Sequence, residues 1–183
     1  METKLLTDGE FQKLINAVHG RDRLIIELLA ATGMRIKELT TITKGHVDLE
    51  ERVIRLNGHI TKTSEPRDVV LPEEVFDHLE EYIHKIEGER LFPISTTRAR
   101  QIIHKAAIDA GIQSSYKDGG DGRTLYKVSP HSLRSYHAVR ALECGVPLNA
   151  VQKQLGHKSI KTTSRYLEAG LNHRKKNYAV FHL

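Results

Sequence analysis

The chain has 183 residues, a length typical of one domain, and 39% of them are hydrophobic, which is enough for a sizeable core. Lysine and arginine outnumber aspartate and glutamate by 28 to 23, and the resulting charge of +5 favours an anionic partner. No apolar run reaches membrane length and no leader sequence is recognisable, so we expect a cytoplasmic protein without a membrane partner.

Cysteine and histidine usage argues against a metal site or a disulfide. Cys144 is the single cysteine, and we expect it to be a small buried residue within a helix, beside Leu142. The 11 histidines include no HExxH pair. We therefore expect no metal and no other cofactor.

The chain opens with two predicted helices. Thr7 followed by Glu10 has the pattern of a capping box, and the apolar residues that follow recur at helical spacing to about residue 19. The stretch 21–33 is apolar on nearly every side, which predicts a central buried helix ending at its glycine. Arg35 follows at once, at the junction with a further helical stripe, where backbone amides are close.

Between Val53 and Leu71 the apolar period changes from helical to alternating, which predicts an antiparallel sheet of two or three strands. A turn around Gly58 and a break at the sequence TSEP separate the segments. Lys62 is expected at the end of the middle strand or in the following turn, where its side chain can reach across a groove. Turn lysines are usually only solvated.

Two further helices are predicted after the sheet. The first opens after Pro72 with an acidic turn and closes at Gly88. The second is capped by Ser95 or Thr96 and ends at Gly111. It carries three cations outside its apolar stripe: Arg98, Arg100 and Lys105. A basic helix of this kind beside a phosphate site could enter a DNA groove, although a solvated charged face is as common.

The stretch from Ser129 onward carries the strongest functional signal. Pro130 is suited to open a helix, because its missing amide has no partner there. His131 and Arg134 are three residues apart and therefore share a face of that helix. Taken alone, this spacing is more simply explained by a surface pair.

A second His and a Tyr follow downstream. His157 comes after an apolar helix that ends at Gly156, and Ser159 can cap a short helix carrying Tyr166. Two basic groups, an imidazole and a phenol can therefore converge. This convergence suits attack by a tyrosine oxygen on a phosphodiester, with cations stabilising the charge that develops on phosphorus.

Two remaining segments lack a strong pattern. Residues 113–124 form the most loop-like stretch of the chain. The tail, 170–183, is basic first and then apolar. We expect its apolar end to pack on this domain or on a neighbouring subunit.

Four motifs, taken together, resemble those of the tyrosine recombinases, the family of phage integrases and Xer-type resolvases. They are ATGMRIKEL, TKTSEPRDVVL, PHSLRSYHA and LGHKSIKTTSRY, and they occur in the family's order across residues 5–167. The resemblance implies a mainly helical α+β catalytic domain with a small antiparallel sheet. It also implies site-specific cleavage and rejoining of double-stranded DNA through a 3′-phosphotyrosine intermediate.

The resemblance assigns six catalytic positions: Arg35, Lys62, His131, Arg134, His157 and Tyr166. In the family the two arginines grip the scissile phosphate, both histidines contact it, and the first histidine helps to handle the nucleophile's proton. Tyr166 matches the nucleophile. Lys62 matches the lysine that protonates the departing 5′ oxygen, although His59 occupies an alternative alignment just after Gly58.

The family usually carries an N-terminal helical domain that completes the DNA clamp. We expect residues 1–183 to be the catalytic domain alone, as a fragment rather than a minimal protein, and so to bind DNA more weakly. Family behaviour implies a homo-tetramer on paired sites. Two alternatives stay open: an enzyme resembling type IB topoisomerases, which relaxes DNA without pairing sites, and a non-catalytic DNA-binding module that retains the fold.

Overall fold

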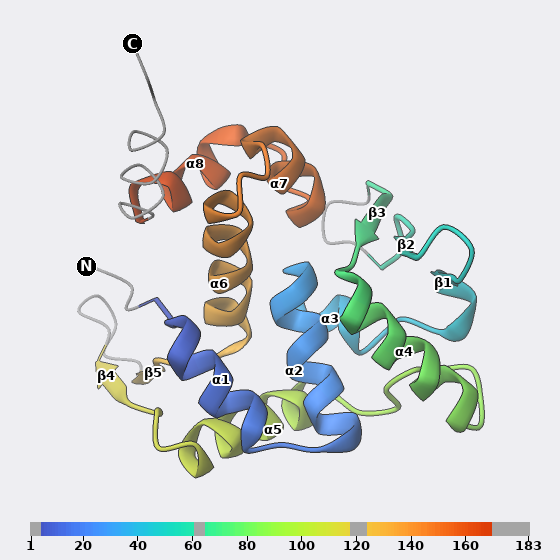
Figure 1. The fold of residues 1–183 in the computed structure, drawn as a ribbon, viewed down its shortest axis with the longest axis horizontal. Helices are drawn as coiled ribbons and strands as arrows, with labels where there is room; N and C mark the ends of the chain where they lie inside the picture. Colours follow the sequence, from blue (N-terminus) through green and yellow to red (C-terminus); the bar gives the residue numbers. More distant parts are fainter. Residues whose placement is uncertain (1–4, 61–64, 118–123, 170–183) are drawn as a thin grey trace.

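The computed structural model describes residues 5–60, 65–117 and 124–169 (Figure 1). Its helices are α1 (Asp8–Asn16), α2 (Gly20–Thr32), α3 (Ile36–Leu39), the 3-10 turn η1 (Lys44–His46), α4 (Glu73–Lys85), α5 (Thr96–Asp109), α6 (Pro130–Glu143), α7 (Leu148–Leu155) and α8 (Ile160–Ala169). Its strands are β1 (Val47–Asp48), β2 (Val53–Leu56), β3 (Arg67–Val70), β4 (Ser115–Lys117) and β5 (Thr124–Tyr126). The expectations for Lys62 and for the tail, 170–183, lie outside the described residues.

Helix α2 forms the centre of the domain, as its sequence predicts. Its apolar residues are buried on all sides, and it packs along α6, with α4 beside it and α5 across its foot (Figure 1). The predicted capping box of α1 is present: Thr7 and Glu10 bond each other's backbone amides, and the helix ends earlier than expected, at Asn16. Within the described residues, no helix is both long and apolar enough to cross a membrane.

The three-stranded sheet is antiparallel, with the order β1-β2-β3. Two of its strands come from the predicted segment, where Val53 pairs with Val70 and Leu56 with Arg67. A further strand, β1, precedes that segment. Most of the expected middle strand after Gly58 lies outside the described residues. The carboxylate of Asp48 accepts hydrogen bonds from two backbone amides of the next turn, which folds β1 back onto β2. The result is a mainly helical α+β domain with a small antiparallel sheet, as predicted.

The prediction of a loop at 113–124 is wrong for residues near both of its ends, because β4 and β5 pair there as an antiparallel hairpin. The amide side chain of Gln113 bonds both backbone groups of Val128, at 3.1 and 3.0 Å, and so closes the base of the hairpin. Tyr126 packs edge-on against His104 of α5, with the ring centroids 4.6 Å apart. These contacts between segments outweigh the loop-like composition.

Helices α6, α7 and α8 share a small apolar cluster of their own. Buried residues of α6 and α7 form it, and Tyr166 packs against them from α8. The prediction for Cys144 is wrong: it is the C-cap of α6 and is exposed. Gly145, with φ of +86°, ends the helix there, so Cys144 does not reach the apolar face.

Gly33 is required where α2 ends. It has φ of +64°, and a Cβ placed on it would lie 2.5 Å from Leu155 Cδ2 and 2.7 Å from His137 Cδ2. We expect Gly33→Ala to lower the free energy of unfolding by about 1–3 kcal/mol, because the methyl group overpacks the junction and φ is unfavourable. Chemical denaturation would measure this loss. Gly111→Ala also has positive φ but open space around it, so it should cost less.

Candidate active site

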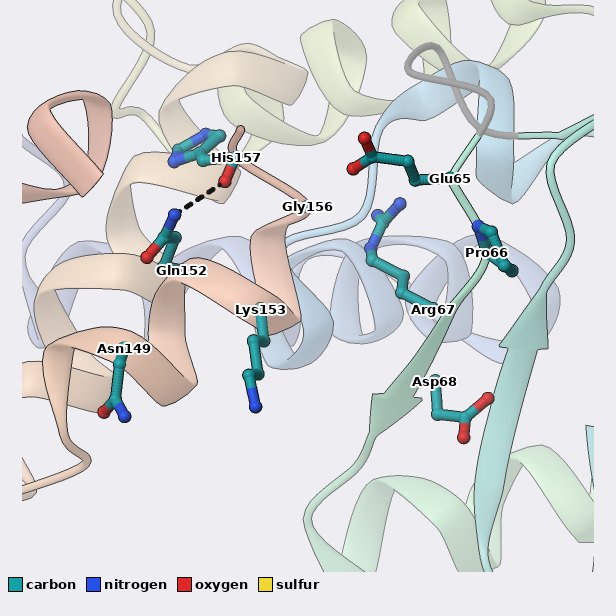
Figure 2. Close-up of a pocket in the computed structure, with 9 residues that line it drawn as sticks. All are labelled: Glu65, Pro66, Arg67, Asp68, Asn149, Gln152, Lys153, Gly156 and His157. Atoms are coloured by element: carbon teal, nitrogen blue, oxygen red, sulfur yellow. Dashed lines mark hydrogen bonds between the residues drawn. The ribbon is translucent and has the colours of Figure 1, made fainter. Parts of the chain in front are cut away.

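A pocket of about 540 Å³ opens between β3 and α7 (Figure 2). Arg67 and His157 line it from opposite sides, and Lys153 of α7 faces it as well. The side chain of Gln152 donates to the carbonyl of His157, which supports the turn that follows α7. The pocket lies where β3 meets α7 and the turn that follows it. A network of arginines lies beside the pocket.

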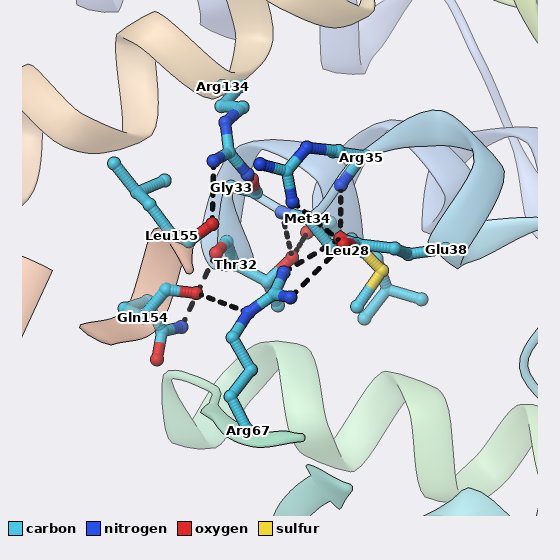
Figure 3. Close-up of polar contacts among 10 residues, drawn as sticks. All are labelled: Leu28, Thr32, Gly33, Met34, Arg35, Glu38, Arg67, Arg134, Gln154 and Leu155. Carbon is cyan, nitrogen blue, oxygen red and sulfur yellow. Dashed lines mark hydrogen bonds and ion pairs between the residues drawn. The ribbon is translucent and has the colours of Figure 1, made fainter. Parts of the chain in front are cut away.

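Arg35 caps α3, immediately after the chain leaves α2. Its backbone amide donates to Glu38 Oε2 at 2.7 Å, and its Nη1 donates to Glu38 Oε1 at 3.0 Å (Figure 3). The side chain is 26% exposed, whereas that of Glu38 is 1% exposed. The guanidinium is therefore anchored on one side and open to a ligand on the other.

Arg134 holds two helix ends together. It is 6% exposed, and its guanidinium donates to the carbonyls of Gly33 and Leu155, the latter at 2.6 Å (Figure 3). These carbonyls end α2 and α7, where helices leave acceptors unsatisfied and the dipole is negative. Burial lowers the pKa of Arg134 to about 10, with a further contribution from Arg35, so the side chain stays charged at neutral pH.

Glu38 lies between two arginines. Arg67 reaches it from β3 with two parallel hydrogen bonds, of 3.1 and 2.7 Å, opposite the contacts from Arg35. Burial would raise the pKa of the Glu38 carboxyl, but the bonds from Arg67 and from the Arg35 amide outweigh it and hold that pKa below its ordinary value. Glu38 is thus an ionised carboxylate that fixes two guanidinium groups.

His157 enters the site from the turn after α7. Gly156 makes this turn with φ of +65°, and His157 Nδ1 lies 2.9 Å from the Thr163 hydroxyl. Burial lowers the pKa of His157 to about 4, and the nearby arginines, led by Arg134, add to the shift. The imidazole is therefore neutral at neutral pH. In the tautomer in which the Thr163 hydroxyl donates to Nδ1, Nε2 carries the proton and can donate it to an anion.

Tyr166 stands next to His157. The rings are nearly parallel, with centroids 6.5 Å apart, and Tyr166 is half-buried on the small cluster of α6 and α7. Its phenol also interacts electrostatically with Arg134. His131 lies in the first turn of α6 and is exposed; partial burial of its ring and the charge of Arg134 lower its pKa. Two imidazoles and a phenol thus lie around the arginine network.

Five of the six predicted catalytic residues therefore come together: Arg35, His131, Arg134, His157 and Tyr166. Lys62 lies outside the described residues, and its rival His59 is exposed in the turn after β2. The three cations of α5 are exposed, and Lys105 pairs with Asp109 at 2.7 Å. However, α5 lies at the opposite end of the molecule from α7 and α8, although it also packs on α2 and α3, between which Arg35 lies (Figure 1).

Comparisons with known proteins identify the family of the chain. The profile of the phage integrase family matches residues 4–173. The chain belongs to this family, the tyrosine recombinases. Tyrosine recombinase XerD of Staphylococcus aureus is 34% identical over 179 residues, which cover 92% of this chain and 57% of XerD. XerD of Staphylococcus epidermidis is 34% identical over 164 residues, covering 88% and 55%.

Solved structures of integrase-family proteins share the fold. The XerA recombinase superposes with a TM-score of 0.77 at 26% identity, covering 96% of this chain and 62% of XerA. The catalytic domain of bacteriophage HP1 integrase gives 0.68 at 23% identity, covering 98% and 95%. The Tn1549 transposon integrase, in complex with a circular intermediate DNA, gives 0.74 at 20% identity, covering 91% and 62%. This integrase-family chain spans little more than half the length of the XerD proteins.

Sequence reasoning missed three residues of this integrase-family site: Glu38, Arg67 and Gln154. Glu38 had a local signal, since it follows Arg35 by three residues on a helical stripe. Arg67 had a weaker signal: in an alternating strand it shares a face with Val69, which is fully buried. An arginine on a buried face needs a carboxylate partner, but the sequence does not say which one.

His137 lies behind the site and predicts a pH dependence of stability. Its ring packs against Gly33, and among the described residues its buried Nε2 has no hydrogen-bond partner. Burial lowers its pKa to about 4 from 6.5. The unfolded chain therefore binds more protons between these values, so stability falls as pH drops from 6.5 towards 4.

We expect His137→Phe to weaken this decline, because phenylalanine cannot take up a proton. Denaturation at pH 7 and pH 5 would measure the change in pH dependence. The same pH dependence in the variant and the parent protein would contradict the assignment to His137.

Proposed function

We propose that residues 1–183 form the catalytic domain of a site-specific recombinase that cleaves and rejoins double-stranded DNA through a 3′-phosphotyrosine intermediate. The observation that carries the proposal is the grouping of Tyr166 and His157 beside Arg134 and Arg35. XerD relatives and solved recombinases of the same family support it. DNA is proposed as the substrate because the Tn1549 integrase was solved in complex with DNA, and because this chain carries a charge of +5.

In the proposed reaction, the oxygen of Tyr166 attacks the scissile phosphorus and the bond from phosphorus to the 5′ oxygen breaks. Arg35 and Arg134 offset the charge on the pentavalent transition state, while neutral His157 donates to a phosphate oxygen. His131 accepts the phenol proton, and Lys62 protonates the 5′ oxygen. A 5′ hydroxyl reverses the step and rejoins a strand. These side chains would act without a metal or other cofactor.

Cations on α5 are proposed to contact DNA outside the reacting centre. Arg98 and Arg100 lie exposed in its first turns, and we expect alanine at both positions to weaken DNA binding. Each lost phosphate contact should reduce the slope of log affinity against log salt by about 1. Fluorescence anisotropy at several salt concentrations would measure the slope. Lys85→Ala on α4 is the control, and an unchanged slope in the Arg98 and Arg100 variants would contradict the assignment.

The wider setting is also a proposal. We infer that the domain acts in the cytoplasm, on the chromosome, as part of a homo-tetramer on paired DNA sites. The tail, 170–183, would pack on this domain or on a neighbouring copy. An enzyme that only relaxes DNA would use the same chemistry, and pairing of two sites would distinguish a recombinase from it. A non-catalytic module would be expected to have lost at least one of the grouped catalytic side chains.

The proposal is tested by incubating the protein with duplex DNA that carries a nick next to candidate sites. The nick releases a short strand after cleavage and so traps the covalent intermediate. We expect an adduct that survives denaturant, with the DNA mapped by peptide mass spectrometry to Tyr166. Adducts at another residue, or none on any family site even when an N-terminal DNA-binding domain is attached, would overturn the proposal.

A further inference from the structure

Arg67 is largely enclosed by the protein and is poorly placed to clamp a phosphate. It lies in β3, on the same face as the buried Val69, and its side chain is only 9% exposed. Its three donor nitrogens are engaged inside the protein: Nη1 and Nη2 bond Glu38, and Nε donates to the carbonyl of Gln154 at 3.0 Å. Such an arginine organises neighbours instead of binding a ligand.

The first neighbour is Arg35, which Arg67 reaches through Glu38. Arg67 meets both oxygens of the carboxylate as a fork, so Arg35 keeps one side-chain bond to it, from Nη1 (Figure 3). Within the described residues, Nε and Nη2 of Arg35 make no hydrogen bond and remain available to an anion. Without Arg67, the buried carboxylate would draw the whole Arg35 guanidinium onto itself.

The second neighbour is the turn that carries His157. Arg67 holds the carbonyl of Gln154 two residues before Gly156, and its guanidinium packs on Gly156 itself. A Cβ at Gly156 would lie 3.0 Å from Arg67 Nη1. The path of the chain into His157 therefore rests on the arginine, and Figure 2 shows both side chains at one pocket.

We infer that Arg67 is a positioning residue for the proposed strand cleavage. It fixes the orientation of the Arg35 guanidinium through Glu38, and it fixes the position of His157 through the turn after α7. Both side chains can then contact the same phosphate. The inference rests on the proposed function for its consequence in catalysis. A simple ion pair would stabilise the fold but would leave the folded site unchanged. The rate of adduct formation per folded molecule distinguishes a positioning residue from a residue that only stabilises the fold.

The test compares Arg67→Met and Arg67→Lys with the parent protein and with Arg55→Met. Arg55 is a matched control, since it lies on β2 of the same sheet, is exposed and pairs with Asp48. The quantities are the rate of adduct formation at saturating DNA, the Kd for DNA and the folded fraction from circular dichroism. Arg67→Lys keeps the positive charge but cannot form the two parallel hydrogen bonds to Glu38. It replaces Arg67→Met in the test if Arg67→Met does not fold.

We expect Arg67→Met to slow adduct formation per folded molecule by about 100-fold, as misplacement of clamping groups does. The Kd should change little, because the Arg67 side chain is only 9% exposed and each of its three nitrogens already donates a hydrogen bond inside the protein. Glu38→Gln should slow adduct formation less in Arg67→Met than in the parent protein, because both substitutions disturb the same placement of Arg35. An unchanged rate per folded molecule would overturn the inference, whereas an inactive parent protein would count against the proposed function instead.

A second measurement does not depend on activity. NMR signals of Arg35 Nε–H and of the His157 ring report their surroundings in the free protein. We expect both to shift in Arg67→Met and Arg67→Lys, and neither to shift in Arg55→Met. Signals that stay at the parent positions in the Arg67 variants would overturn the inference even if no DNA were cleaved.

Discussion

Tyr166→Phe should abolish the covalent protein–DNA adduct while leaving DNA binding and stability nearly unchanged. The substitution removes only the phenolic oxygen, which is the proposed nucleophile, so no phosphotyrosine can form. The ring is half-buried on the cluster of α6 and α7, and phenylalanine retains that packing. The expected loss is complete, because no other group among the described residues stands in the same position.

Gel electrophoresis under denaturing conditions would measure the adduct, and anisotropy would measure DNA binding. Tyr126→Phe is the matched control, since Tyr126 is 45% exposed on β5 and packs on His104, away from the site. Its adduct should equal that of the parent protein. An adduct that persists in Tyr166→Phe would show that another residue attacks the phosphorus.

Glu38→Gln should be the most destabilising single change among the residues of the site. The carboxylate is 1% exposed and is bonded by both Arg35 and Arg67. Glutamine has the same shape but no charge, so it leaves a buried arginine without a counter-ion. Breaking a buried pair in this way costs about 3–5 kcal/mol, and Arg35 loses its anchor as well. We therefore expect both lower stability and slow cleavage by the remaining folded protein.

Denaturation as a function of pH would test the origin of that loss. The folded-state pKa of Glu38 is depressed below 4.5, so its contribution is present above pH 4.5 and disappears as pH falls through the folded value. The difference between Glu38→Gln and the parent protein should therefore narrow in acid. Glu81→Gln, an exposed residue of α4, should change stability little at any pH. A difference that stays constant in acid would contradict a charge-based role.

Local sequence signals account for much of the site. The glycine that ends α2 and the proline that opens α6 place Arg35 and Arg134 at defined helix ends. The turn at Gly156 does the same for His157. Each of these features depends on a few neighbouring residues, and the structure has each one as predicted.

Contacts between distant segments could not be predicted. Arg67 meets Glu38 across 29 residues, and the choice of partner depends on which face of β3 turns inward. The β4–β5 hairpin was missed because its polar, loop-like residues hide a pairing that Gln113 fixes from outside. Cys144 was misplaced because the end of α6 is set by Gly145. In each case tertiary contacts or chain geometry outweighed the local pattern.

Gln154 restricts which surfaces of this chain are available for association with another copy. Its side-chain amide donates to the carbonyl of Val70 at 2.8 Å and accepts from the amide of Val70 at 3.1 Å, as a further strand would. Unpaired strand edges can recruit strands from other molecules and so lead to aggregation. Here α7 closes the outer edge of β3, and the other edge strand, β1, is only two residues long. This sheet is therefore poorly suited to strand addition, and the proposed assembly of copies on DNA would use other surfaces.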